Sequence, residues 1–103
     1  GMFKSCENKG VQITFDNGWT ISVQWGKGNY CDRRFSMETE QGIVECKNAE
    51  VAVWDADGVW LPMSDGDDVI GWQTPDDIAA LIARVSAFPK GSDILDEADT
   101  ILE

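Results

Sequence analysis

The sequence predicts a single α+β domain: an antiparallel sheet of about five strands, a C-terminal helix packed on one face, and a short terminal helix. Two observations carry this prediction. Two segments alternate apolar and polar residues around an Asp-Asn-Gly turn, and one later segment has helical periodicity between clear start and stop signals. The 103 residues suffice for one core. Gly1 precedes Met2 as a remnant of a cleaved tag does, so we expect the domain to span residues 2–103.

The first two strands are predicted at residues 11–15 and 19–25, where the apolar side chains occupy odd positions. A two-residue turn at Asn17-Gly18 would set apolar residues against polar ones across the hairpin. A three-residue loop, residues 16–18, places every apolar residue on one face, with Gly18 at positive φ. The expected pairs are Phe15 with Trp19, Ile13 with Ile21 and Val11 with Val23.

Strand signals are weaker in the middle of the chain. The expected elements are short strands at 35–38 and 43–47, a hairpin at 50–54 and 58–63, and an extended segment at 69–72. In residues 50–54 apolar side chains occupy both parities, so that strand should be covered on both faces. Pro62 lacks a backbone donor, so its strand should end there or lie at an edge.

The clearest helix signal runs from Pro75 to about Phe88. Thr74 suits the N-cap and Pro75 the first helical position, while Pro89 and Gly91 end the helix. Its apolar face consists of Ile78, Leu81, Ile82, Val85 and Phe88. A second, short helix is expected from Ser92. Its apolar stripe would be formed by Ile94, Leu95, Ala98, Ile101 and Leu102.

Charge is distributed unevenly along the chain. The formal net charge is −11, and residues 55–103 carry twelve acids against only Arg84 and Lys90. Direct nucleic-acid binding requires clustered Lys and Arg, so this field disfavours it. The same field favours a partner protein with a basic surface, although solubility alone would also account for it.

No recognisable catalytic apparatus is present, which favours a non-catalytic protein. The absence of His excludes nucleophile–His arrangements and His-ligated metals. Cys6, Cys31 and Cys46 are odd in number and unevenly spaced, so we expect reduced thiols, no cofactor and no metal. Neither a signal peptide nor a membrane-spanning run is seen, and we expect a cytoplasmic protein without membrane contact.

One segment, the 25–34 loop, has a composition beyond what a turn requires. It combines aromatic, amide and cationic side chains after a predicted strand, and loops on a rigid hairpin often carry function. The candidate ligand-binding residues are Trp25, Lys27, Asn29, Tyr30, Arg33 and Arg34. Arg33 or Arg34 would hold an anionic or amide-bearing group. Alternatively, both pair only with the protein's own carboxylates.

The five Trp residues, at positions 19, 25, 54, 60 and 72, all lie in or beside predicted strands, which favours the core. A domain this small cannot easily bury five Trp side chains. An exposed pair would therefore mark a binding surface.

Three stretches resemble small uncharacterised proteins of tailed bacteriophages and environmental bacteria. They are Ile13-Thr14-Phe15 with Asn17 to Gly26 and Gly28 to Cys31, then Glu50-Val51-Ala52-Val53-Trp54, and Gly71-Trp72-Gln73-Thr74-Pro75. The resemblance covers most of the chain. It implies a bacterial cell or a phage-infected host, and it transfers no functional residue.

These observations favour a non-catalytic acidic module that binds a basic host or phage protein, for example as a phage-derived modulator. The alternative is a small-ligand binder or modest enzyme that uses the 25–34 loop. A concave pocket lined by that loop and a Trp would favour this alternative. Self-association as an assembly component is the third reading, and a large apolar self-interface would support it.

Overall fold

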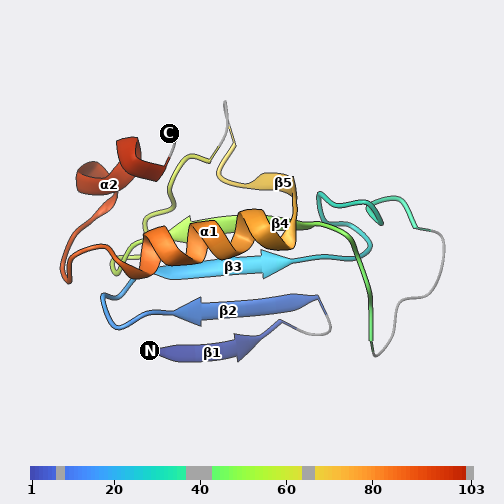
Figure 1. Ribbon diagram of the computed structural model, residues 1–103, viewed down its shortest axis with the longest axis horizontal. Coiled ribbons are helices and arrows are strands. Elements are labelled where there is room, and N and C mark those ends of the chain that lie inside the picture. Colours follow the sequence, from blue (N-terminus) through green and yellow to red (C-terminus); the bar gives the residue numbers. More distant parts are fainter. Residues whose placement is uncertain (7–8, 37–42, 64–66, 102–103) are drawn as a thin grey trace.

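The computed structural model describes residues 1–6, 9–36, 43–63 and 67–101. Its elements are β1 (Met2–Ser5), β2 (Gly10–Thr14), β3 (Thr20–Gln24), β4 (Ala49–Trp54), β5 (Ile70–Gln73), α1 (Pro75–Ser86) and α2 (Ile94–Ile101). The five strands form one antiparallel sheet whose order follows the chain, β1-β2-β3-β4-β5. α1 crosses one face of this sheet, and α2 lies near the end where α1 terminates (Figure 1). The predicted α+β class is confirmed.

The first hairpin has the predicted register. Val11 pairs with Val23 and Ile13 with Ile21. The Phe15 N–H donates to the Trp19 carbonyl at 2.9 Å, which leaves a three-residue loop. Within this loop Gly18 has φ 94°, as expected. The odd-numbered apolar residues therefore share the face that α1 covers.

α1 begins and packs as its sequence predicts. The Thr74 side chain accepts from the Asp77 N–H, and the Asp77 carboxylate accepts from the Thr74 N–H, which completes a capping box. Val85 and Phe88 are buried in the core with Trp19. The other apolar residues of the helix, Ile78, Leu81 and Ile82, are partly buried against the same core. The helix itself ends at Ser86, two residues earlier than expected.

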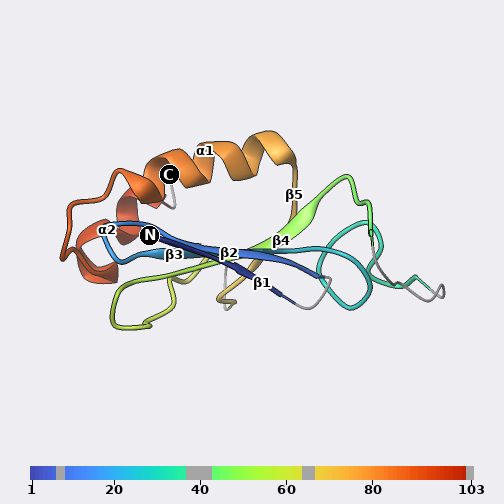
Figure 2. The same cartoon turned by 90° about the horizontal axis from the view of Figure 1, so that it is seen from below.

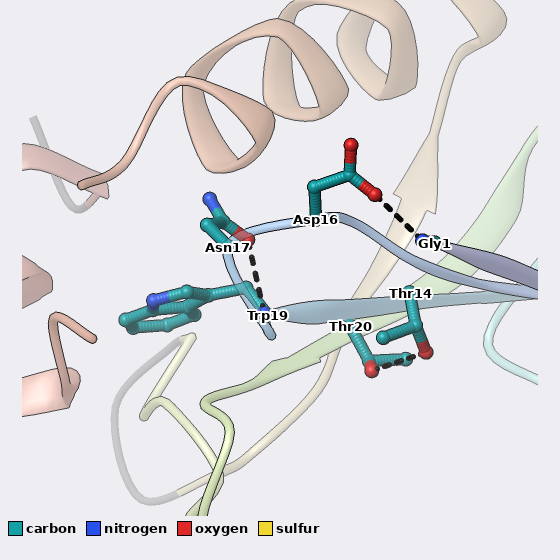
Figure 3. A network of polar contacts seen from close by, with 6 residues as sticks. All are labelled: Gly1, Thr14, Asp16, Asn17, Trp19 and Thr20. Carbon is teal, nitrogen blue, oxygen red and sulfur yellow. Dashed lines mark hydrogen bonds and ion pairs between the residues drawn. The ribbon is translucent and has the colours of Figure 1, made fainter. Parts of the chain in front are cut away.

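Asn17 connects the hairpin loop to the C-terminal end of α1. Its side-chain amide is buried and donates to the carbonyl oxygens of Val85 at 2.8 Å and Phe88 at 3.0 Å. Its Oδ1 accepts from the Trp19 N–H at 3.0 Å (Figure 3). The last carbonyls of a helix have no partner within the helix. The Asn17 side chain therefore supplies hydrogen-bond partners both to carbonyls at the end of α1 and to a backbone N–H in the turn.

α2 docks beside this junction. The Trp19 Nε1–H donates to the carbonyl of Ser92 at 3.1 Å, and the Ile94 N–H donates to the Asp55 carboxylate at 3.3 Å. Ile94 packs against the core, as predicted. Leu95 does not belong to an apolar stripe, since it is 88% exposed. The predicted stripe residues 98, 101 and 102 lie outside the described side chains.

β4 is covered on both faces, as its sequence predicts. Val51 and Val53 are buried on the α1 side. Thr20, Ser22 and Ala52, which have the opposite parity, are buried as well. Seen edge-on, the sheet has α1 on one side and residues 55–63 on the other (Figure 2).

Three strand predictions are wrong. Residues 58–63 form no strand. They make a bridge between Trp60 and Trp54, a bond from the Leu61 N–H to the Val53 carbonyl and one from the Asp55 N–H to the Val59 carbonyl, and Pro62 then has no N–H to continue a ladder. Residues 43–47 and the described part of 35–38 contain no strand, and the rest of that segment lies outside the described residues. The fifth strand is instead β1, which the sequence analysis missed.

The Trp residues divide between core and surface. Trp19 is fully buried, and Trp25 and Trp54 are half-buried. Trp60 is 44% exposed and Trp72 is 53% exposed, so the core prediction is wrong for these two. Trp60 stacks on Trp54 with ring centroids 4.9 Å apart.

We predict that Asn17→Ala destabilises the protein. The substitution removes the side-chain donor of the Phe88 carbonyl and the acceptor of the buried Trp19 N–H, whereas the Val85 carbonyl keeps the Phe88 N–H, and we expect a cost of about 1–3 kcal/mol. Chemical denaturation measures the free energy of unfolding. Asp16→Ala, at a neighbouring exposed residue, is the control and should change little. Equal stability of the wild type and Asn17→Ala would contradict this role of the amide.

We also predict that Gly18→Val lowers thermal stability strongly. A β-branched residue tolerates φ 94° poorly, and a Cβ at this position would lie 2.8 Å from the Ala56 Cβ. Gly58→Val is the comparison, because Gly58 has φ 79° but no atom within 4 Å of an added Cβ. Both variants should melt earlier than the wild type, and Gly18→Val should melt earliest. An unchanged melting temperature for Gly18→Val would refute the loop assignment.

Candidate functional site

The candidate site lies in the connection between β3 and β4, at the end of the sheet opposite the β2–β3 turn (Figure 1). The described part of this connection contains no helix or strand, and its shape comes from bonds within the loop. The Gly28 N–H donates to the Arg34 carbonyl, and the Arg34 N–H donates to the Cys31 carbonyl, both at 3.1 Å. Gly26 and Gly28 have φ 98° and 88°, which glycine adopts without strain.

Tyr30 anchors this loop to the sheet through its backbone. Its N–H donates to Oε2 of Glu50, on β4, at 2.7 Å. Its carbonyl oxygen accepts from the N–H of Trp72, on β5, at 2.8 Å. The loop is thus bonded to two neighbouring strands at a single residue, which fixes the position of the Tyr30 ring.

A β-bulge in β5 makes this anchor possible. Ala49 pairs with Gln73 and Val51 with Ile70, so Gly71 and Trp72 together lie opposite Glu50. Trp72 has φ 53°, which is rare for a bulky side chain and marks a strained position. The bulge turns the Trp72 N–H from the ladder toward Tyr30. At Gly71, an added Cβ would lie 2.5 Å from the Tyr30 Cβ, so only glycine allows this approach.

The anchored loop presents a cluster of aromatic and cationic side chains, which we call the aromatic platform and define as Tyr30, Arg34, Phe35 and Trp72. The Tyr30 and Trp72 rings stack with centroids 5.8 Å apart. The Arg34 guanidinium lies 4.3 Å from the Tyr30 ring centroid and 4.9 Å from that of Phe35, within cation–π range. Phe35 is 81% exposed. The platform is therefore ordered by contacts among its own members and remains open to solvent.

An open pocket of about 450 Å³ adjoins the platform. Its lining residues are Cys31, Asp32, Arg33, Arg34, Phe35, Ser36 and Trp72. Cationic, anionic and aromatic groups thus meet in one hollow. A second hollow of about 360 Å³ lies on the α1 side of the sheet, where Val23 and Trp25 face Ile78 and Ile82.

Three of the six predicted site residues lie at the platform or its pocket, and the other three do not. Tyr30, Arg33 and Arg34 lie at the platform or its pocket. Asn29 is buried and donates to the Trp25 carbonyl at 3.1 Å, so it shapes the loop. Two others are not gathered at the pocket: the Trp25 Nε1–H donates to the Val44 carbonyl at 2.8 Å, and Lys27 is exposed.

Sequence reasoning missed Phe35 and Trp72. Phe35 directly follows the 25–34 loop and could have been included with it. Trp72 is about 40 residues away in sequence, and only the pairing of β5 with β4 brings it to the loop. A Gly-Trp pair inside an extended segment was the one available signal, because glycine within a strand often marks a bulge.

A second cluster lies at the wall of the pocket, where Cys31 and Asp32 converge with Cys46. Their two sulfur atoms and a carboxylate oxygen lie within 4.8 Å of one another. Burial, together with the neighbouring Cys31, raises the pKa of the Cys46 thiol to about 12. This thiol is therefore protonated at neutral pH and is not an activated nucleophile.

Comparisons with known proteins give no relative from which a role could be transferred. The chain matches no protein family, and no curated protein or solved structure is similar to it. None of the helices in the described part of the chain has the length and apolar character that a bilayer-spanning segment requires. The phage resemblance of the sequence stays a prediction.

We predict that Gly71→Ala displaces the 25–34 loop and destabilises the protein by about 1–3 kcal/mol, as overpacking does elsewhere. The reason is the short approach of an added Cβ to the Tyr30 Cβ and carbonyl oxygen, at 2.5 and 2.9 Å. Gly28→Ala is the control, because an added Cβ there meets no atom within 4 Å and the cost is that of positive φ alone. Chemical denaturation compares the two. A smaller loss at Gly71 than at Gly28 would contradict the anchoring role of Gly71.

Proposed function

We propose that this protein is a non-catalytic module that binds another protein through the aromatic platform. The observation that carries the proposal is the exposure of Trp72 and Phe35 on a surface held in place by Tyr30 and Arg34. Trp, Tyr and Arg are the residues that dominate binding energy at protein interfaces. Strain at Trp72 supports the same conclusion, since strained residues concentrate at functional sites.

The net charge of the chain supports a partner with a basic surface. Asp67 and Asp68 precede β5 in the sequence and Asp76 and Asp77 follow it, and all four are exposed. Trp72 therefore lies in an acidic stretch of sequence, within a chain of net charge −11, while the platform itself carries Arg34. A net negative charge of this size speeds association with a cationic partner and makes it sensitive to salt. With the phage resemblance, this favours a modulator of a basic host or phage protein in the bacterial cytoplasm.

A small-ligand function is the second candidate, and the pocket specifically favours it. A hollow lined by the loop and a Trp is what this alternative requires, and Arg33, Arg34 and Trp72 all line it. Arginine in such a pocket suits a carboxylate, a phosphate or an amide on a planar group. Asp32 in the same lining disfavours a highly charged anion.

We predict that Trp72→Gly abolishes partner capture while the protein still folds. Glycine suits φ 53°, so relief of about 1–2 kcal/mol of strain offsets lost stacking on Tyr30. The assay is capture from bacterial lysate at low and high salt, with captured proteins identified by mass spectrometry. Trp60→Ala, which changes an exposed Trp of the other stack, is the matched control and should capture normally.

The outcomes separate the candidates. Capture of a basic protein that weakens at high salt and is lost in Trp72→Gly supports the protein-binding function. Capture that survives in Trp72→Gly contradicts it. If no protein is captured and a small anionic compound raises the melting temperature of the wild type but not of Arg33→Ala/Arg34→Ala, the second candidate is correct.

A further inference from the structure

We propose that Cys31, Asp32 and Cys46 form a Zn²⁺-binding site, with two thiolates and one carboxylate as protein ligands. This site lies outside the aromatic platform and does not depend on the proposed function. The three donor atoms converge within 4.8 Å although Cys31 and Cys46 are far apart in sequence. They come from the first third and the last three residues of the connection between β3 and β4.

The donor set and spacing suit zinc. Zn²⁺ binds Cys sulfur at about 2.3 Å and Asp oxygen at about 2.0–2.2 Å in tetrahedral geometry, which places two sulfur ligands roughly 3.8 Å apart. The observed separations of up to 4.8 Å need only a small contraction. Thiolate sulfur is a poor ligand for Mg²⁺ and Ca²⁺, so the cluster discriminates against these more abundant ions.

Hydrogen bonds already orient Cys31 and Asp32, two of the three proposed ligands. The Gly26 N–H donates to the Cys31 Sγ at 3.2 Å, the kind of bond that supports a coordinating thiolate. The Cys31 thiol in turn donates to the Gly26 carbonyl at 3.3 Å, and zinc binding would release this proton and that of Cys46. The Asp32 carboxylate accepts from the Lys47 N–H at 3.3 Å through Oδ2. The Asp32 N–H donates to Oδ1 of Asn48 at 2.7 Å. These contacts bond the Asp32 side of the loop to the residues beside Cys46.

The position of the cluster indicates that a bound ion would stabilise the connection between β3 and β4. The connection spans 24 residues, and its described part has no regular element, which is unusual in a small domain. A metal shared by Cys31 and Cys46 would cross-link its first third to its last three residues and stabilise the folded loop. Because Cys31 and Asp32 also line the pocket, the ion would hold the pocket wall in place. Three protein ligands leave a fourth position for water or another donor.

The test is titration of the reduced full-length chain with Co²⁺ and then Zn²⁺. We expect one equivalent of Co²⁺ to produce a sulfur-to-cobalt charge-transfer band, and Zn²⁺ to displace it. Cys46→Ser and Asp32→Asn should weaken binding, whereas Cys6→Ser, which removes the third cysteine, should bind as the wild type does. Asn48→Ala should weaken binding about 10- to 100-fold, as loss of a supporting contact does at other sites.

Circular dichroism of each metal-free variant keeps the result interpretable. Asp32 is exposed, so Asp32→Asn should fold even if a cysteine variant does not. Loss of the cobalt band in folded Asp32→Asn and Cys46→Ser, with the band kept in Cys6→Ser, supports the site. Absence of the band in the wild type, or its survival in both ligand variants, overturns the proposal. A Cys31–Cys46 disulfide that forms under a thiol oxidant, in a chain that binds no metal when reduced, also overturns it.

Discussion

The architecture depends on the placement of one buried amide. The Asn17 side chain lies in the β2–β3 turn, where water cannot satisfy it, and each of its polar atoms must find a partner in the protein. Its donors bond to the end of α1 and its acceptor to the Trp19 N–H. These bonds hold the C-terminal end of α1 at the β2–β3 turn, where Phe88 contacts Trp19 with ring centroids 4.9 Å apart. The apolar face of the helix then packs along the core from this fixed end.

The opposite end of the sheet is organised in another way. There, the Gly71–Trp72 bulge breaks the ladder of β5, and the Trp72 N–H bonds to Tyr30 instead of a neighbouring strand. The irregular backbone at this end of the sheet holds an exposed aromatic surface in a fixed geometry. The regular end gives stability, and the proposed binding function is assigned to the irregular end, a division common in proteins whose loops act on a rigid scaffold.

Sequence reasoning succeeds where the pattern is local. The parity of the apolar residues in β2 and β3 decides the hairpin register, and Thr74 with Pro75 places the start of α1, because both depend only on neighbouring residues. It fails for β1, whose four residues are all exposed and therefore have no burial pattern to detect. It also fails for residues 58–63, whose backbone leaves the sheet after Leu61.

The candidate site was half predictable for the same reason. Tyr30, Arg33 and Arg34 belong to one loop and could be grouped by composition. Trp72 joins them through strand pairing and a bulge, both tertiary features. Cys31 and Cys46 could not be paired from sequence either. Without His, and with an odd third cysteine, their spacing resembles no known ligand pattern.

The agreement of strand order with chain order bears on how the protein folds. Each strand pairs with the next in sequence, so most of the sheet can assemble by successive short-range closures, a topology that favours rapid folding. The connection between β4 and β5 is longer, at 15 residues, and the β3–β4 pairing must close 24 residues, whereas β2 and β3 are separated by five. By loop-closure entropy the β3–β4 pairing costs about 1.4 kcal/mol more than the β2–β3 hairpin. The step that forms the centre of the sheet therefore has the highest closure entropy, and it is also the step that brings the 25–34 loop beside β4.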